Sequence, residues 1–169
     1  VQIEQEMMWS LRECVDFSLR SFKRMPFEKW IRRWPLQVAM SVVQIMFTVE
    51  IERNIQKHSK LKELLKTYTD LTNEAVKLLR VEKSRKHWNI LNSIIICYLY
   101  QRDVIEHLMS TFTTKLTDFA WFSQAKYYYK PPNKDGTTVD EQMSSLKINL
   151  LGINSNYGYE YIKPTSRLV

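Results

Sequence analysis

Glycine is scarce in this chain of 169 residues, which holds only Gly136, Gly152 and Gly158. A phosphate-binding loop needs several closely spaced glycines, because the backbone amides must approach the anion without a side chain in the way. The sequence therefore contains neither a Walker A loop nor a dinucleotide fingerprint. It also lacks a GxSxG elbow and a cysteine paired with a positioned histidine. We accordingly predict no catalytic residues in this chain.

Histidine is equally sparse, and His58, His87 and His107 stand far apart in the sequence. Only His107 has acidic neighbours, namely Asp103 on the same helix face and the adjacent Glu106. Two or three candidate ligands are a weak signal for a metal, and helices commonly carry ion pairs at this spacing. We therefore predict no metal site, and we expect an ion pair on the surface of a helix.

The chain has two cysteines, Cys14 and Cys97, which lie in apolar helical patterns without CxxC spacing. Buried, reduced thiols are the expectation for such residues. The most apolar stretch, residues 90–100, is too short to cross a bilayer, so no membrane partner is expected. The first residue is not Met, and the last residues are apolar, which indicates that both ends are cut from a longer chain.

The net charge of +7 raises the question of a nucleic-acid partner. The basic residues form short clusters at predicted helix ends and junctions, where cations complement the helix dipole or face water. A partner-binding patch is the alternative interpretation of these clusters. No zinc-finger spacing, RNP motif or basic zipper accompanies them, so we do not expect nucleic-acid binding.

Apolar residues recur at helical spacing through most of the chain. The patterns predict helices over residues 3–22, 38–56, 61–79, 88–109 and 119–128, and Asp118 is expected to cap the last one. Pro26 ends the first helix, and Pro35 suits the start of the second. The fold class is therefore mainly α, an elongated bundle of about five helices.

The pattern changes after residue 130, where a turn-rich loop over 131–145 precedes alternating apolar residues. Gly152 to Asn156 resembles a hairpin turn, and Tyr157, Tyr159 and Tyr161 alternate as they would on one buried side of a strand. We therefore divide the chain into a helical part over 1–130, a loop over 131–145 and a short C-terminal β-hairpin over 146–169.

Four stretches in this order are together similar to one family, the dynein heavy chains. The similarity covers about residues 30 to 169, although Lys163 and Pro164 depart from the Gly-Asn usual in that family. The stretches are 34–38 (WPLQV) with 44–52 (QIMFTVEIE), 102–104 (RDV), 118–128 (DFAWFSQAKYY), and 157–161 (YGYEY) with 167–169 (RLV).

This resemblance implies the C-terminal part of the dynein linker, running into the first AAA+ module of the motor ring. It implies that residues 1–130 are linker and that 146–169 enter the module, with Leu168 and Val169 at the edge of the adenine pocket. ATP or ADP with Mg would bind the full-length protein, and no cofactor would bind this segment alone. The segment would itself be no enzyme, although its parent would be an ATPase motor.

The implied partners are the rest of the heavy chain with its AAA+ ring, microtubules through the parent's stalk, and dynein light and intermediate chains through its tail. The motif variants favour an axonemal type in a cilium or flagellum over a cytoplasmic one. A stand-alone, basic helical protein-interaction module without motor activity is the alternative.

Overall fold

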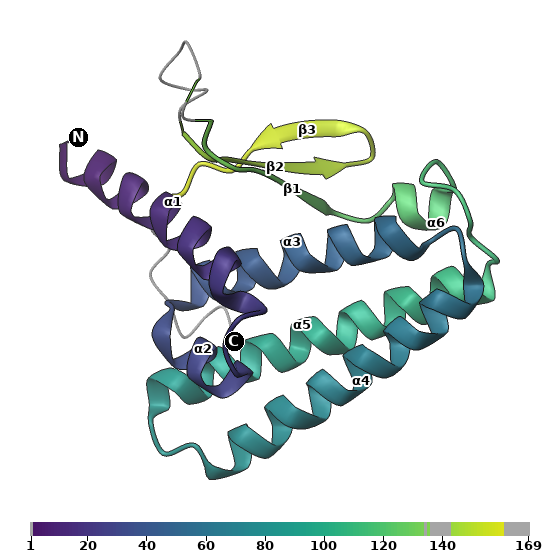
Figure 1. Ribbon diagram of the computed structural model, residues 1–169, viewed down its shortest axis with the longest axis horizontal. Helices are drawn as coiled ribbons and strands as arrows, with labels where there is room; N and C mark the ends of the chain where they lie inside the picture. Colours follow the sequence, from purple (N-terminus) through teal and green to yellow (C-terminus); the bar gives the residue numbers. More distant parts are fainter. Residues whose placement is uncertain (1, 134, 136–142, 161–169) are drawn as a thin grey trace.

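The computed structural model describes residues 2–133, 135 and 143–160, in which helices predominate and a small sheet forms near the C-terminal end (Figure 1). The mainly α prediction with a C-terminal β-hairpin is confirmed. In chain order the elements are α1 (Gln2–Phe22), α2 (Phe27–Arg33), α3 (Leu36–Asn54), α4 (His58–Val81), α5 (Arg85–Ser110), α6 (Phe119–Phe122), β1 (Lys126–Lys130), β2 (Ser145–Leu150) and β3 (Ile153–Asn156).

Two prolines separate the first three helices. Pro26 and Pro35 lie in extended conformations at the N-caps of α2 and α3, because a proline ring is compatible with the start of a helix but not with its interior. Helix α2 itself, only seven residues long, is absent from the sequence prediction. The side chain of Trp30 anchors it, since its Nε1–H donates to the backbone oxygen of Ser18 in α1 at 3.1 Å.

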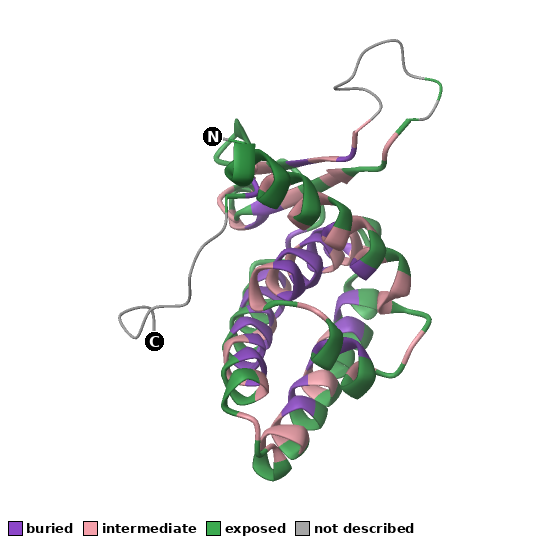
Figure 2. Ribbon diagram, turned by 90° about the vertical axis from the view of Figure 1, so that its left-hand side faces the viewer, coloured by how far each residue is buried: buried purple, intermediate pink, exposed green. Residues whose placement is uncertain are grey.

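Helix α3 lies in the middle of the molecule. The antiparallel pair α4 and α5 packs along one side of it, and the three-stranded sheet lies along the opposite side, as Figure 1 shows. Buried residues accordingly occur all around α3 (Figure 2), which explains why its sequence is apolar on most of its circumference. Among the described residues, no helix combines the length and apolar character that a membrane span requires.

Aromatic rings form a continuous chain of contacts through this core. Successive ring centroids lie 4.8 to 6.3 Å apart, within the range of favourable aromatic pairs. This series of aromatic contacts begins in α6, passes through α3, α4, α5 and α2, and ends in α1. Its rings, in order, belong to Trp121, Phe47, Tyr68, Tyr98, Phe27, Trp30 and Phe22.

The predicted helix over 119–128 is wrong beyond Phe122, because strand β1 begins at Lys126. Asp118 does not cap α6. Its Oδ2 instead accepts the backbone amides of Thr114 and Lys115, each at 3.0 Å, and so closes the preceding turn. The tyrosines that follow favour strands, and they pair antiparallel with β2, with Tyr127 opposite Ile148.

The hairpin turn also lies earlier than predicted, at Leu151 and Gly152, so that residues 153–156 form β3. Both turn residues have positive φ, 51° and 82°, as a two-residue type I′ connection requires. Tyr157 and Tyr159 follow the strand, and a positive φ of 55° at Tyr159 interrupts the expected alternation. Tyr159 is nevertheless buried against the ring of Tyr157. Tyr161 lies outside the described residues.

Candidate functional site

The C-terminal sheet is fastened to the helices by hydrogen bonds that we call the helix–sheet joint, made by Asp16, Gln37, Thr48 and Glu52 with residues 127–129, 157 and 160. At its centre, the backbone N–H of Tyr127 in β1 donates to Oγ1 of Thr48 in α3 at 2.9 Å. The same hydroxyl donates to the carbonyl of Gln44 at 3.0 Å. Thr48 is 1% exposed, and its hydroxyl serves both as donor and as acceptor inside the structure.

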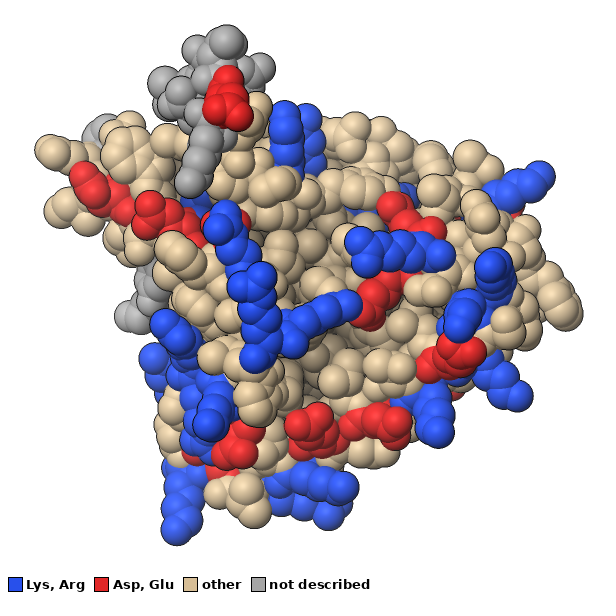
Figure 3. Space-filling view, in the orientation of Figure 1, with Lys and Arg blue, Asp and Glu red and all other residues tan. Residues whose placement is uncertain are grey.

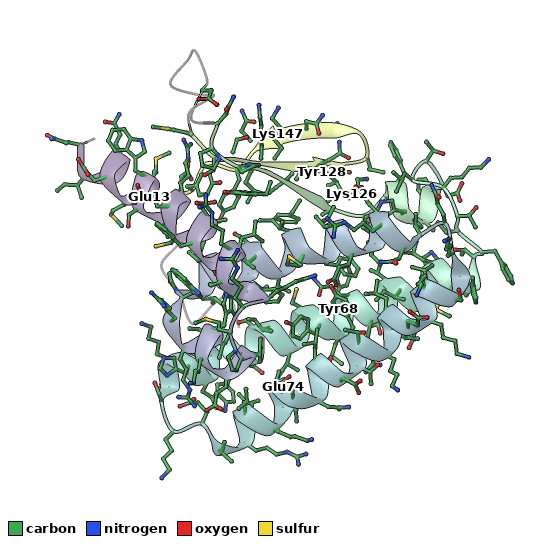
Figure 4. All side chains as sticks on the ribbon, in the orientation of Figure 1. Glu13, Tyr68, Glu74, Lys126, Tyr128 and Lys147 are labelled. Carbon is green, nitrogen blue, oxygen red and sulfur yellow. The ribbon has the colours of Figure 1, made fainter. Side chains whose placement is uncertain are left out.

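Two tyrosine–carboxylate bonds lie beside this contact. The hydroxyl of Tyr128 donates to Glu52 in α3 at 2.6 Å, and that of Tyr129 donates to Asp16 in α1 at 2.5 Å. Bonds to an ionised carboxylate are short and stronger than neutral ones. Burial, and then the neighbouring carboxylate, raises the pKa of both tyrosines, so both hydroxyls remain donors. Figure 4 labels Tyr128 where β1 faces α3.

The chain after β3 is held at the other end of α3. Gln37 donates through Nε2 to the hydroxyl of Tyr157 at 2.8 Å and to the carbonyl of Glu160 at 2.7 Å. The guanidinium of Arg12 in α1 lies 5.1 Å from the ring centroid of Tyr159, a cation–π distance. Burial raises the pKa of Tyr159 to about 12, although Arg12 opposes the shift.

Lys126, at the start of β1, is a buried cation of the sheet. Its Nζ donates to the carbonyl of Phe122 at 2.8 Å and lies 5.1 Å from the centroid of the Phe122 ring. Burial lowers the pKa of this lysine, and the nearby carboxylate of Glu52 acts against that shift. The ammonium group therefore ties β1 to the end of α6.

Helix α3 reaches the α4–α5 pair through further side chains. Gln44 accepts a hydrogen bond from Gln101 in α5 at 3.2 Å, and Gln101 is fully buried. Glu50 accepts the hydroxyl of Tyr68 in α4 at 3.1 Å and also lies 3.3 Å from Nζ of Lys23. The polar residues of α3 thus face partners on both sides of the helix.

The other residues considered in the sequence take no part in the joint. Asp103, Glu106 and His107 are exposed on α5, and the expected ion pair among them is not formed within the described part of the chain. An exposed pair gains little over hydration. No group of three potential metal ligands occurs among the described residues. The predicted adenine-edge residues Leu168 and Val169 lie outside those residues.

Both thiols are free. Cys97 is buried as predicted, and burial raises its pKa to about 12, whereas Cys14 is only partly buried. Burial, and then the charge of Glu13, also raises the pKa of Cys14, so neither thiol is poised to react as a thiolate near neutral pH.

Three of the four stretches that resemble the dynein family contribute to the joint. Gln37, Thr48 and Glu52 come from the first stretch, Tyr127 and Tyr128 from the third, and Tyr157 and Glu160 from the fourth. Sequence reasoning missed Arg12 and Asp16, because they precede the matching region and bind partners more than 100 residues away. No local pattern marks them.

No protein-family model matches the chain. Over 168 residues it is 29% identical to human dynein axonemal heavy chain 3 and 26% identical to human dynein axonemal heavy chain 1, which covers 99% of this chain in both cases. Mouse dynein axonemal heavy chain 12 is 26% identical over 170 residues, which covers all of it.

The chain is homologous to axonemal dynein heavy chains. It spans only 4% to 5% of the length of these relatives, so it corresponds to one segment of a dynein heavy chain. The axonemal type that the motif variants favour agrees with the names of all three relatives.

Proposed function

We propose that this chain is the C-terminal part of a dynein linker and that it couples the first AAA+ module of its parent to the swing of that linker. The observation that carries the proposal is the helix–sheet joint. Stretches that resemble the family, separated by up to 120 residues, supply most of the side chains that fasten the sheet to α3. Homology over nearly the whole chain supports the same assignment.

The physical basis of coupling is stiffness. A swinging element transmits a displacement only if its parts move together. Strand β1 contacts α3 near its middle through Thr48 and near its end through Glu52, and the segment that follows β3 contacts its beginning through Gln37. The aromatic chain continues from α6 to α1. These contacts favour a joint in which a shift of the sheet moves the helices with it.

The parent supplies the remaining parts of the mechanism. In the proposed assignment, ATP or ADP with Mg binds beyond the helix–sheet joint, and Leu168 and Val169 pack against the adenine. Hydrolysis, microtubule binding and assembly with light and intermediate chains belong to other segments of the parent heavy chain. The site of action is the axoneme of a cilium or flagellum.

The reading frame of the parent gene provides a direct test. A Gly-Lys-Thr phosphate loop within a few dozen codons after Val169 supports the proposal. A stop codon immediately after Val169, in a complete transcript, contradicts it and leaves the stand-alone helical interaction module as the better assignment.

A second test separates coupling from catalysis in the parent motor. Replacing Tyr128 and Tyr129 by Phe removes both tyrosine–carboxylate bonds and retains the rings. We expect slower microtubule gliding at unchanged ATP turnover, because the ATPase site is intact while the joint is loosened.

The matched control is Tyr100→Phe, which removes a 2.7 Å bond to Gln124 outside the joint. We expect it to leave the gliding velocity unchanged. Equal gliding velocities for the double variant and the unmodified motor, or a parallel loss of gliding and ATP turnover, would show that the joint does not couple them.

A further inference from the structure

The positive charge of the chain is concentrated around α2. Residues 20–33 contain six Lys or Arg and one Glu, a net charge of +5 out of the chain's +7. Figure 3 shows Lys and Arg side chains gathered at the end of the molecule where α2 lies. The sequence prediction left open whether such clusters are merely solvated or bind a partner.

Neighbouring carboxylates neutralise only part of this cluster. Arg20 pairs with Asp16 at 2.8 Å, Lys23 lies 3.3 Å from Glu50, and Arg32 contacts Glu82 at 2.8 Å and Glu28 at 3.6 Å. Within the described residues, no carboxylate lies within 4 Å of the three remaining cations, Arg24, Lys29 and Arg33.

Two of the unpaired cations border a groove between α1 and α2, with a volume of about 510 Å³. Arg20, Arg24 and Arg33 line it together with apolar side chains, of which Phe17 is 58% exposed. The guanidinium of Arg33 lies 5.5 Å from the ring centroid of Trp34. Nε1 of Trp34 is buried and has no acceptor among the described residues.

We propose that this groove, defined by Phe17, Arg20, Arg24, Arg33 and Trp34, binds an acidic peptide segment that also carries an apolar side chain. Arginine guanidinium groups match carboxylates with two parallel N–H donors. Phe17 and the ring of Trp34 offer the apolar contact. Aromatic and arginine side chains are also the residue types that dominate binding energy at protein interfaces.

The number and placement of the charges at the groove favour a peptide over a nucleic acid. Electrostatic binding of a duplex relies on several phosphate contacts spread along its length, whereas, as far as the described residues go, Arg24 and Arg33 are the two cations of the groove without a carboxylate partner. The ion pairs of Arg20 and Arg32 also place carboxylates beside the patch, which would repel an extended phosphate backbone. A short segment with carboxylates and one apolar residue fits both the charges and the aromatic wall.

Binding of a labelled peptide to the 169-residue chain tests this proposal. The probe is fluorescein-labelled Asp-Glu-Glu-Phe-Glu-Asp-Glu-Leu, followed by anisotropy at low salt. We expect the Arg24→Glu, Arg33→Glu variant to bind it at least about tenfold more weakly, which corresponds to a loss of about 1.4 kcal/mol.

Lys62→Glu, Lys66→Glu is the matched control, because it changes the net charge equally at exposed positions of α4. We expect its affinity for the peptide to change much less than that of the groove variant. Far-UV circular dichroism of both variants confirms that the helices are retained. Equal weakening of peptide binding by the two variants would overturn the proposal. The peptide would then be attracted by the net positive charge of the chain and not by the groove.

Two further measurements address the apolar wall and the rival ligand. Phe17→Ala is expected to weaken peptide binding without changing its dependence on salt, because no charge is removed. A 20-nucleotide single-stranded DNA is expected to bind less tightly than the peptide. If the DNA binds more tightly and displaces the peptide, the groove is a nucleic-acid site and the proposal is wrong.

Discussion

Replacing Thr48 by Val removes the hydroxyl at the centre of the helix–sheet joint while keeping the shape of the side chain. In the native structure this hydroxyl accepts the N–H of Tyr127 at 2.9 Å and donates to the carbonyl of Gln44 at 3.0 Å. The Gln44 carbonyl retains its helical partner in the variant. The Tyr127 amide loses its acceptor, and the loss of a partner for a buried donor costs about 1–3 kcal/mol.

A change of this size is readily measured. For a domain of this length, 1 kcal/mol shifts the melting temperature by about 2–4 °C, so Thr48→Val is expected to melt about 2–12 °C lower. Urea titration followed by circular dichroism gives the free energy of unfolding. Hydrogen exchange at the Tyr127 amide reports the joint itself, and a local loss of 1.4 kcal/mol would speed exchange about tenfold if that amide exchanges through local opening.

Thr72→Val provides the matched control on α4. Thr72 is also buried, 6% exposed, and its hydroxyl donates to the carbonyl of Tyr68 at 2.7 Å, again four residues earlier in the helix. Among the residues that the structure describes, it accepts no bond from another element. We therefore expect Thr72→Val to be near neutral, because burying a methyl in place of a hydroxyl offsets the lost bond.

The comparison of these two variants can refute the reasoning. If Thr48→Val and Thr72→Val change the free energy of unfolding equally, within about 0.5 kcal/mol, the interaction with Tyr127 contributes nothing. Unchanged exchange at the Tyr127 amide would lead to the same conclusion, since that amide would then be protected by the sheet alone.

Four other predictions concern single side chains. Leu151→Asn is expected to raise the free energy of unfolding by about 0.5–1 kcal/mol in urea titration, because Asn tolerates a positive φ better than Leu. Tyr68→Phe is expected to destabilise the chain by about 1.5–3 kcal/mol through loss of the bond to Glu50. Tyr98→Phe should be neutral or stabilising in the same assay, because its buried hydroxyl has no partner among the described residues. The amides of Lys115 and Thr114 lower the pKa of Asp118. The stability from Asp118 is therefore present above the ordinary Asp pKa and is lost as the pH falls through the lowered one, which carbon NMR of its carboxyl can follow.

The long helices were predictable from the sequence because their burial is regular. The apolar residues of α4 recur on one face, and those of α3 surround the helix since both of its sides are covered. Strand β1 was not predictable in this way. The aromatic residues from Trp121 to Tyr129 fit a helical spacing as well as an alternating one, and only the distant pairing with β2 decides between them.

In the candidate site, too, some residues were predictable from the sequence and their contacts were not. The resemblance to dynein identified Gln37, Thr48 and Glu52 as a group, but it did not indicate what each one contacts. Asp16 binds Tyr129 across 113 residues of sequence, and a single aspartate on the polar side of α1 carries no local sign of that partner. Such contacts arise from the crossing of α1 over the beginning of α3 (Figure 1), which is a tertiary property.

The placement of the joint contacts determines which motions of the sheet the structure resists. Bonds from α3 alone, at Gln37, Thr48 and Glu52, lie along one helix axis and would still permit the sheet to roll about that axis. The bond from Asp16 to Tyr129 comes from α1, which crosses α3, and therefore lies off that axis. The cation–π contact of Arg12 with Tyr159 also comes from α1. Contacts along a line together with contacts away from it fix the orientation of a rigid body. The sheet can therefore turn relative to the helices only if these two α1 contacts break or α1 moves with it.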